Sequence, residues 1–309
     1  MNSHSFRFAA SIGVDLLRAV AVTIGIIVFT FFLIRMIPGD VVDVRGIEGS
    51  LTYSQQSVMR EELGLNKPWL TQFLDWSMMI LSGDLGQSAR FARPIADLLG
   101  AVLPSTLLLG ATALVIGVVV GVSVSVLAVL FPRSIFVKIV DIITIWSIAV
   151  PTFSIGIVSL IVFAVWLDWI SAIGNFLVPA IILGMDAAGS ITKALHEDMR
   201  EAETAEFVRA AQARGLSRTS IVLRHILPNA FTVTIAIVGL MLAGIFTGAI
   251  TMEVVFGLPG LGTLTLQAIR GRDYAVVQAI IIWLGVTVIF ANFVADVIRK
   301  LINPRLRTI

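Results

Sequence analysis

The sequence predicts an all-α polytopic membrane protein with six transmembrane helices. Of its 309 residues, 57% are hydrophobic and only 14% are charged, whereas about a quarter of the residues of a soluble domain are charged. The apolar segments are continuous rather than alternating, which favours membrane helices over a β-barrel. Six of them are long enough to span a bilayer. They cover residues 17–37, 98–131, 139–166, 176–191, 230–252 and 276–298.

Composition excludes several classes of site. The chain has no cysteine, so disulfides, Cys-ligated zinc and iron–sulfur clusters are absent. The net charge of +2 gives no support for binding nucleic acid. The first apolar segment is not followed by a small-x-small cleavage pattern, so we expect a retained span rather than a removed signal peptide. Pro104 and Pro151 lie inside apolar segments, where each is expected to kink a helix, either as a fixed bend or as a hinge.

The distribution of basic residues predicts the orientation. Of the 22 Lys and Arg residues, fourteen fall on one side and seven on the other if the spans alternate, and Arg35 lies at a span end. Because the richer side is normally cytoplasmic, both termini are expected inside. The chain then forms one domain, 1–309, with an extracytoplasmic loop over 38–97 and a cytoplasmic loop over 192–229. Short helices are expected in the first loop at 55–63 and 70–81.

The cytoplasmic loop has the pattern of a helix, a glycine turn and a second helix. Residues 197–214 are rich in good helix formers, Gly215 suits the left-handed position after a helix, and Ser217 suits the N-cap of the next one. Small side chains at Ala210 and Ala211 lie beside Phe207. This favours docking on a soluble partner over a helix that lies flat on the lipid bilayer.

Motifs in this loop resemble a known family. Arg209-Ala210-Ala211, three residues, Gly215, nine residues and then His225-Ile226-Leu227-Pro228 resemble the signature of ABC importer permeases, Glu-Ala-Ala, three residues, Gly, nine residues, Ile-x-Leu-Pro. Arg209 and His225 depart from that pattern, and the loop 167–175 is shorter than the family's. Seven further blocks resemble the permeases of dipeptide, oligopeptide and nickel importers, in the same order along the chain: 35–40, 63–68, 83–88, 103–107, 253–262, 273–278 and 303–307.

The resemblance implies a type I ABC importer permease fold and a non-catalytic translocation subunit in the bacterial cytoplasmic (inner) membrane. The partners it implies are a homologous second permease subunit, two cytoplasmic ATPase subunits and an extracytoplasmic substrate-binding protein. No cofactor or metal is expected on this chain; ATP and Mg²⁺ belong to the ATPases. The sequence agrees, since no lysine stands in a phosphate-binding Gly-Lys-Ser/Thr motif. The residues expected to couple to the ATPase are Glu206, Phe207, Arg209, Ala210, Ala211, Arg214 and Gly215.

Two further groups of residues are candidates for transport. Ionisable or helix-breaking residues in spans are often functional, so Pro151, Asp186 and Glu253 are expected along the translocation path or at its gate. A turn on the extracytoplasmic side is expected to contact the binding protein through Phe256, Pro259, Gly260 and Gly262.

The cargo implied by the resemblance is a dipeptide or oligopeptide. Nickel or a metal–chelator complex, glutathione or another small solute remain alternatives with the same machinery. A secondary transporter or channel is a more distant alternative, because neither internal repeats nor carboxylate relays are visible. An intramembrane zinc protease is disfavoured, because His196-Glu197 is followed by Arg200 where a second ligand would stand.

Overall fold

The structure is a computed structural model that describes residues 3–47 and 51–302; the sequence block 303–307 lies outside the described residues. Within the described ranges, all regular structure is helical, apart from an isolated β-bridge between Gln87 and Pro94. The α-helices are α1 Ser3–Arg35, α2 Val41–Ile47, α3 Tyr53–Glu62, α4 Trp69–Leu81, α5 Ile95–Leu130, α6 Ile135–Ala149, α7 Thr152–Ser159, α8 Leu177–Glu203, α9 Glu206–Ala213, α10 Arg218–Ile221, α11 Leu227–Phe256, α12 Leu261–Arg270 and α13 Tyr274–Ile302, and two π-helical segments are η1 Leu160–Trp166 and η2 Val222–Ile226.

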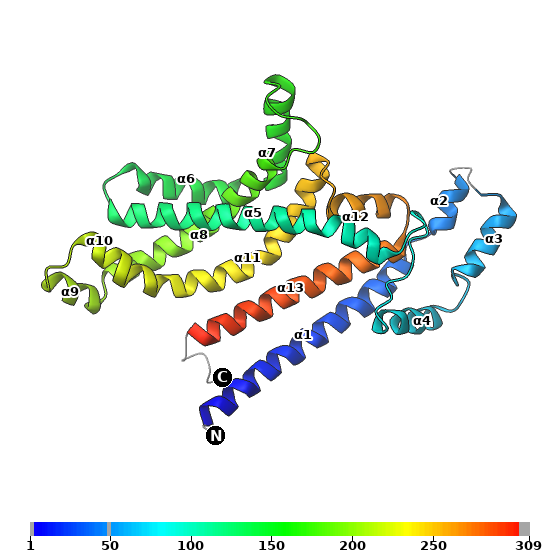
Figure 1. Cartoon of the computed structure of the whole chain (residues 1–309), viewed down its shortest axis with the longest axis horizontal. Coiled ribbons are helices and arrows are strands. Elements are labelled where there is room, and N and C mark those ends of the chain that lie inside the picture. Colours follow the sequence, from blue (N-terminus) through cyan, green and yellow to red (C-terminus); the bar gives the residue numbers. More distant parts are fainter. Residues whose placement is uncertain (1–2, 48–50, 303–309) are drawn as a thin grey trace.

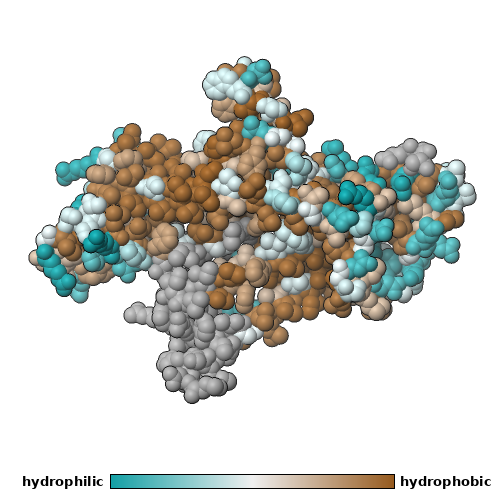
Figure 2. Space-filling model, viewed as in Figure 1, coloured by the Kyte–Doolittle hydropathy of each residue, from teal (hydrophilic) through white to brown (hydrophobic). Residues whose placement is uncertain are grey.

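The long helices form one layered body with polar ends. Helices α5, α6, α8 and α11 lie alongside one another, and α1 lies beside α13 (Figure 1). The start of α1 and the short helices α9 and α10 lie toward the left of this view, and α2, α3 and α4 lie at the right. Figure 2 shows apolar side chains over the middle of the molecule and hydrophilic ones at both ends. This arrangement suits a bilayer around the middle and places the two polar loops at opposite ends.

The six predicted apolar segments are helical over most of their length, and one of them, 139–166, is bent. Four described helices are long and apolar enough to cross a membrane, or up to six if each bent pair counts as one span. The predicted span 139–166 is such a pair: α6 and the segment Thr152–Trp166 meet at 98°. Pro151 stands at the corner as the N-cap of α7, because proline cannot donate the backbone hydrogen bond that would continue α6. The sequence predicts a kink there, and the observed bend is much sharper.

Small residues line the contact of α5 with α8, which is the most extensive contact between helices in the described part of the chain. A Cβ on Gly117 would lie 2.6 Å from the Cβ of Ala187, and a Cβ on Gly184 would lie 2.6 Å from Cγ2 of Ile116. Gly121 is similarly close to Ile191. The Gly117-x-x-x-Gly121 pattern of α5 therefore serves close helix packing. These contacts leave no room for side chains, so α5 and α8 are held at short range.

Candidate functional site

Helix α9 is short and amphipathic, and its two faces differ. Val208 and Ala211, one turn apart, are 2% and 4% exposed and pack in a cluster with Met199 of α8. The helix predicted through 197–214 is broken before Glu206, because Ala205 adopts an extended conformation. A continuous helix would carry Val208 away from α8, so the burial of these two apolar side chains explains the break.

The opposite face of α9 is exposed. It carries Glu206, Phe207, Arg209 and Ala210, and Arg214 and Gly215 at its end are exposed as well. The ring of Phe207 is 41% exposed although it is large and apolar. Six of the seven residues expected to meet an ATPase therefore point outward. Ala211 is the seventh; it packs on the chain's own core, so it positions the helix and offers no surface to a partner.

The turn after α9 has the predicted conformation. Gly215 has a φ of +74°, in the left-handed region that favours glycine, and its amide donates to the carbonyl of Gln212 over 2.9 Å. The hydroxyl of Ser217 accepts from the amide of Ser220 over 3.3 Å and caps α10. The predicted helix, glycine turn and second helix are confirmed, with the correction at Ala205 described above.

Arg218 connects this turn to two long helices. Its Nη2 donates to the carbonyl oxygen of Val129 over 2.6 Å, and its Nε donates to that of Leu130 over 3.1 Å. Nη2 also pairs with Oε1 of Glu203 over 2.9 Å. The two carbonyls end α5, where such groups lack intrahelical partners and a cation is favoured. Nothing in the local sequence pointed to Arg218, since its carbonyl partners lie 88 and 89 residues away.

Glu253 caps a helix from inside the protein. Its side chain is 0% exposed, and its Oε2 accepts from the amide of Gly262 over 2.6 Å. The hydroxyl of Thr106 in α5 accepts from the amide of Leu261 over 2.9 Å. Two side chains from α11 and α5 thus satisfy amides at the N-terminus of α12, where the helix dipole also favours a carboxylate.

The turn between α11 and α12 hides most of the residues expected to contact a binding protein. Phe256, Gly260 and Gly262 are buried, and Pro259 is exposed. A Cβ on Gly260 would lie 2.1 Å from Oε1 of Glu253, which explains why glycine is needed there. Of the four candidates, Pro259 alone presents a surface at this turn.

The remaining path candidates lie apart from Glu253. Asp186 is partly buried in α8. On either side of it, Gly184 lies against α5 and Gly189 lies against Ser147 of α6. Within the described part of the chain, the carboxylate of Asp186 makes no hydrogen bond or ion pair. Pro151 is exposed at the corner of α6 and α7. The structure does not bring Pro151, Asp186 and Glu253 together in one cluster.

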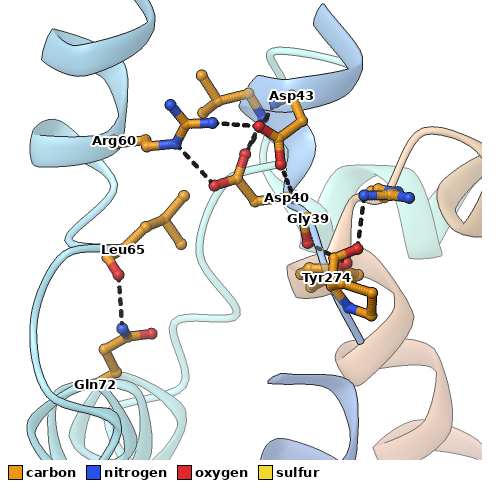
Figure 3. A network of polar contacts seen from close by, with 10 residues as sticks. Gly39, Asp40, Asp43, Arg60, Leu65, Gln72 and Tyr274 are labelled. Carbon is orange, nitrogen blue, oxygen red and sulfur yellow. Dashed lines mark hydrogen bonds and ion pairs between the residues drawn. The ribbon is translucent and has the colours of Figure 1, made fainter. Parts of the chain in front are cut away.

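A polar network at the opposite end of the molecule was not predicted. Figure 3 shows Arg60 of α3 facing both Asp40 and Asp43. Its Nε lies 3.0 Å from Oδ2 of Asp40, and its Nη2 pairs with Oδ1 of Asp43. Hydrogen bonding to Asp40 raises the pKa of the Arg60 guanidinium above its ordinary value. This pairing holds α3 against the start of α2.

The same network joins distant parts of the chain. Arg272 Nη1 donates to the carbonyl of Pro38 over 2.7 Å, and the hydroxyl of Tyr274 donates to that of Gly39 over 2.6 Å. These bonds connect the end of the first span to the corner between α12 and α13. Asp273 between them is buried and accepts from the hydroxyl of Ser88 over 2.5 Å. Each of these partners is distant in sequence, so no local pattern could indicate them.

Comparison with known proteins identifies the family. Residues 113–308 match the family described as "Binding-protein-dependent transport system inner membrane component". The glutathione transport system permease protein GsiC of Escherichia coli is 31% identical over 91% of this chain and 93% of its own length. A probable peptide ABC transporter permease protein of Sinorhizobium fredii is 30% identical over 96% and 99%. A putative peptide transport system permease protein of Brucella abortus is 28% identical over 94% and 96%.

A solved structure supports the fold. The inward-facing MetNI methionine ABC transporter contains a chain that superposes with a TM-score of 0.56 at 23% identity, covering 67% of this chain and 96% of that chain. At this identity the likeness shows the fold alone. Together with the matched family model and the relatives, the observations lead to one conclusion: the chain belongs to the family of inner-membrane components of binding-protein-dependent transport systems.

Proposed function

We propose that this chain is the membrane-spanning subunit of an ATP-driven importer and that α9 docks on a soluble ATPase. One observation carries the proposal: α9 is held to its own chain by Val208 and Ala211 while Phe207 and Ala210 stay exposed. A large apolar ring beside a small side chain, at the polar end of a membrane protein, suits insertion into a groove.

The partners follow from the chemistry that this chain lacks. It has no phosphate-binding loop motif, so hydrolysis of ATP with Mg²⁺ belongs to two partner ATPase subunits. A pair of ATPases offers two grooves, and this chain has one α9, so a second homologous permease subunit completes the assembly. A substrate-binding protein meets the opposite end, where Pro259 and the loop 38–97 are available. The assembly lies in the bacterial cytoplasmic membrane, with α9 and both termini on the ATPase side.

Motion of the ATPases has a defined route into the spans. A push on α9 reaches the turn at Gly215 and then Arg218, which is bonded to the ends of α5 and α8. These two helices pack through glycines and alanines, so they move together as a rigid pair. In this proposal the corner at Pro151 absorbs the change in helix angle and Asp186 lines the path, while Glu253 holds the bend between α11 and α12.

The proposed cargo is a short peptide. The names of the relatives described above refer to peptide or glutathione transport. The sequence motifs resemble those of dipeptide and oligopeptide permeases, so both lines of argument support a short peptide as the cargo. Glutathione is the second candidate, because the relative that carries its name is 31% identical to this chain.

Cysteine cross-linking tests the docking of α9. The natural chain has no cysteine, so in a variant with one introduced cysteine any cross-link from this chain comes from that position. Ala210→Cys, on the exposed face, is expected to cross-link to a cysteine in the ATPase groove in the assembled complex. Ala211→Cys, one residue along but 4% exposed, is the matched control and is expected to stay unreacted. Equal cross-linking at both positions, or none at Ala210→Cys, contradicts the proposal.

Transport itself needs a second measurement. The complex reconstituted in liposomes with its ATPases and binding protein is expected to accumulate labelled peptide with ATP and not with a non-hydrolysable analogue. Accumulation driven by an ion gradient without ATP would instead indicate a secondary transporter.

A further inference from the structure

Helix α4 is packed against the C-terminal end of α1, at the end of the molecule opposite α9 (Figure 1). The centroid of the Phe73 ring lies 5.1 Å from that of Phe31 and 5.7 Å from that of Phe32. The ring of Trp76 also lies 5.1 Å from that of Phe31. Phe31 precedes Arg35, the last residue of α1, by one turn, which is about 6 Å along the helix axis. The middle of α4 therefore lies level with the last turns of a span and not beyond its end.

The polar face of α4 is turned toward an open cavity. Gln72, Asp75 and Met79 share this face of the helix, and they line the cavity together with the end of α1 and the corner between α12 and α13. Arg35 Nε donates to Oε1 of Gln72 over 2.9 Å, and Asp75 pairs with Lys67 over 2.7 Å. These bonds and the aromatic contacts with α1 fix the rotation of α4 about its own axis.

A further face of α4 is apolar and exposed. It carries an apolar row of large side chains, about one turn apart and each more than half exposed: Leu70, Leu74, Met78 and Leu81. With 3.6 residues per turn, this apolar row falls on the side of the helix away from the polar face. A continuous row of large apolar side chains is unfavourable in water, so it calls for an apolar cover.

Lipid is the cover available at this level of the molecule. Phe29 and Leu33 of α1, on either side of the level of Phe31, are large, apolar and exposed, as expected for a span in contact with lipid. Helix α4 begins at the half-exposed Trp69, and tryptophan is enriched where a membrane meets water. Amphipathic helices at that boundary bury their apolar face by about 5–10 Å, which fits the depth of Phe31 below the end of α1. A soluble protein would meet the lipid headgroups before it reached this level.

We propose that α4 is an interfacial helix, whose apolar row lies in the boundary between headgroups and acyl chains of the leaflet at this end of the molecule. Phospholipid is therefore the partner of this surface. The bilayer holds α4 and the loop before it beside α1, and it leaves the polar face of α4 in contact with water in the open cavity. This placement goes beyond the proposed function and does not depend on the cargo.

Fluorescence quenching at two adjacent positions tests the placement. The full chain, in phosphatidylcholine nanodiscs with the subunits that assemble with it and with cysteine removed from those subunits, carries one bimane label. The label stands at Met78→Cys, in the apolar row, or at Met79→Cys, the matched control that lines the cavity. A doxyl group on the acyl chain near the headgroup is expected to quench the label at Met78→Cys several-fold more than the label at Met79→Cys. Iodide in the water phase is expected to show the reverse order.

Each other result overturns the proposal in its own way. Stronger quenching of the Met78→Cys label by iodide than by the doxyl lipid would place the apolar row in water. Quenching of that label by neither reagent would mean that another protein subunit covers the row. A doxyl group at the end of the acyl chain that quenches more strongly than the shallow one would mean that α4 is embedded in the bilayer and does not lie at its surface. Addition of a substrate-binding protein is expected to leave both labels unchanged, and protection of Met78→Cys only after this addition would assign the row to that protein.

Discussion

The carboxylate of Glu253 and the amide of Gly262 are joined by a 2.6 Å hydrogen bond across the bend between α11 and α12. The two helical segments meet there at 70°. Since the carboxylate comes from the last turn of one segment and the amide from the first turn of the next, the bond fixes the angle between them. Glu253 thus stabilises the bend between α11 and α12. From the sequence, a charged residue here was expected along the translocation path or at its gate.

Replacing Glu253 tests this task. Glu253→Ala removes the acceptor and leaves the buried amide of Gly262 unsatisfied, so we expect a loss of about 2 kcal/mol in unfolding free energy. Glu253→Gln keeps an acceptor oxygen, and we expect a smaller loss. Unfolding in mixed micelles measures both, with the exposed Glu61→Ala as the control. If Glu253→Gln alters transport at unchanged stability, the charge lines the path instead.

Glycine positions give a second prediction. A Cβ on Gly262 would lie 2.1 Å from the carbonyl oxygen of Ile250, a backbone atom that cannot rotate away. Gly262→Ala is therefore expected to destabilise the protein by about 3 kcal/mol. Gly244→Ala, in the same helix as Ile250 but with nothing within 4 Å of its Cβ, is expected to be neutral or to stabilise by up to about 1 kcal/mol. Comparable losses for both variants would show that the close approach is not what matters.

Arg218 is expected to affect coupling more than stability. Arg218→Ala removes the bonds to Val129, Leu130 and Glu203. The side chain is 51% exposed, so the loss of the ion pair with Glu203 should cost about 1 kcal/mol or less. We expect ATP hydrolysis to continue while peptide uptake per ATP falls several-fold. Glu203→Ala, which leaves the contacts with α5, is the comparison and should uncouple less; an unchanged ratio for Arg218→Ala would refute the role.

Gly215 tests the rigidity of the turn. Its φ of +74° penalises a side chain although no atom lies within 4 Å of a Cβ, so Gly215→Ala should cost about 1 kcal/mol through backbone strain alone. Asparagine tolerates this conformation better, so Gly215→Asn should retain more uptake than Gly215→Ala. Uptake and ATPase activity of the reconstituted complex measure the effect. The reverse order would mean that side-chain size, and not backbone conformation, limits this position.

The sequence predicted features that depend on neighbouring residues. The apolar segments, the glycine turn at Gly215 and the two short helices expected at 55–63 and 70–81 all appear, the latter as Tyr53–Glu62 and Trp69–Leu81. Each depends on hydropathy, helix propensity or capping over a few residues. The fold class follows from the same local information.

Features that depend on tertiary contacts were missed. The break at Ala205 exists because Val208 packs against α8. The residues on both sides of Ala205 are good helix formers, so helix propensity alone predicts a continuous helix there. The cap of α12 by Thr106 bridges 155 residues. Ala211 and Phe256 were expected to face partners, and their burial became visible only once the neighbouring helices were in place.

The bonds from Arg272 and Tyr274 to the carbonyls of Pro38 and Gly39 also set an order of events during synthesis. Their donors follow the acceptors by 234 and 235 residues, so the first span leaves the ribosome long before its hydrogen-bonding partners exist. Until the last span inserts, α1 and the helices that follow it have no fixed place against α13. A ribosome stalled before residue 272 should therefore hold an N-terminal region that proteases cleave readily, and completion of the final hydrophobic segment should protect it.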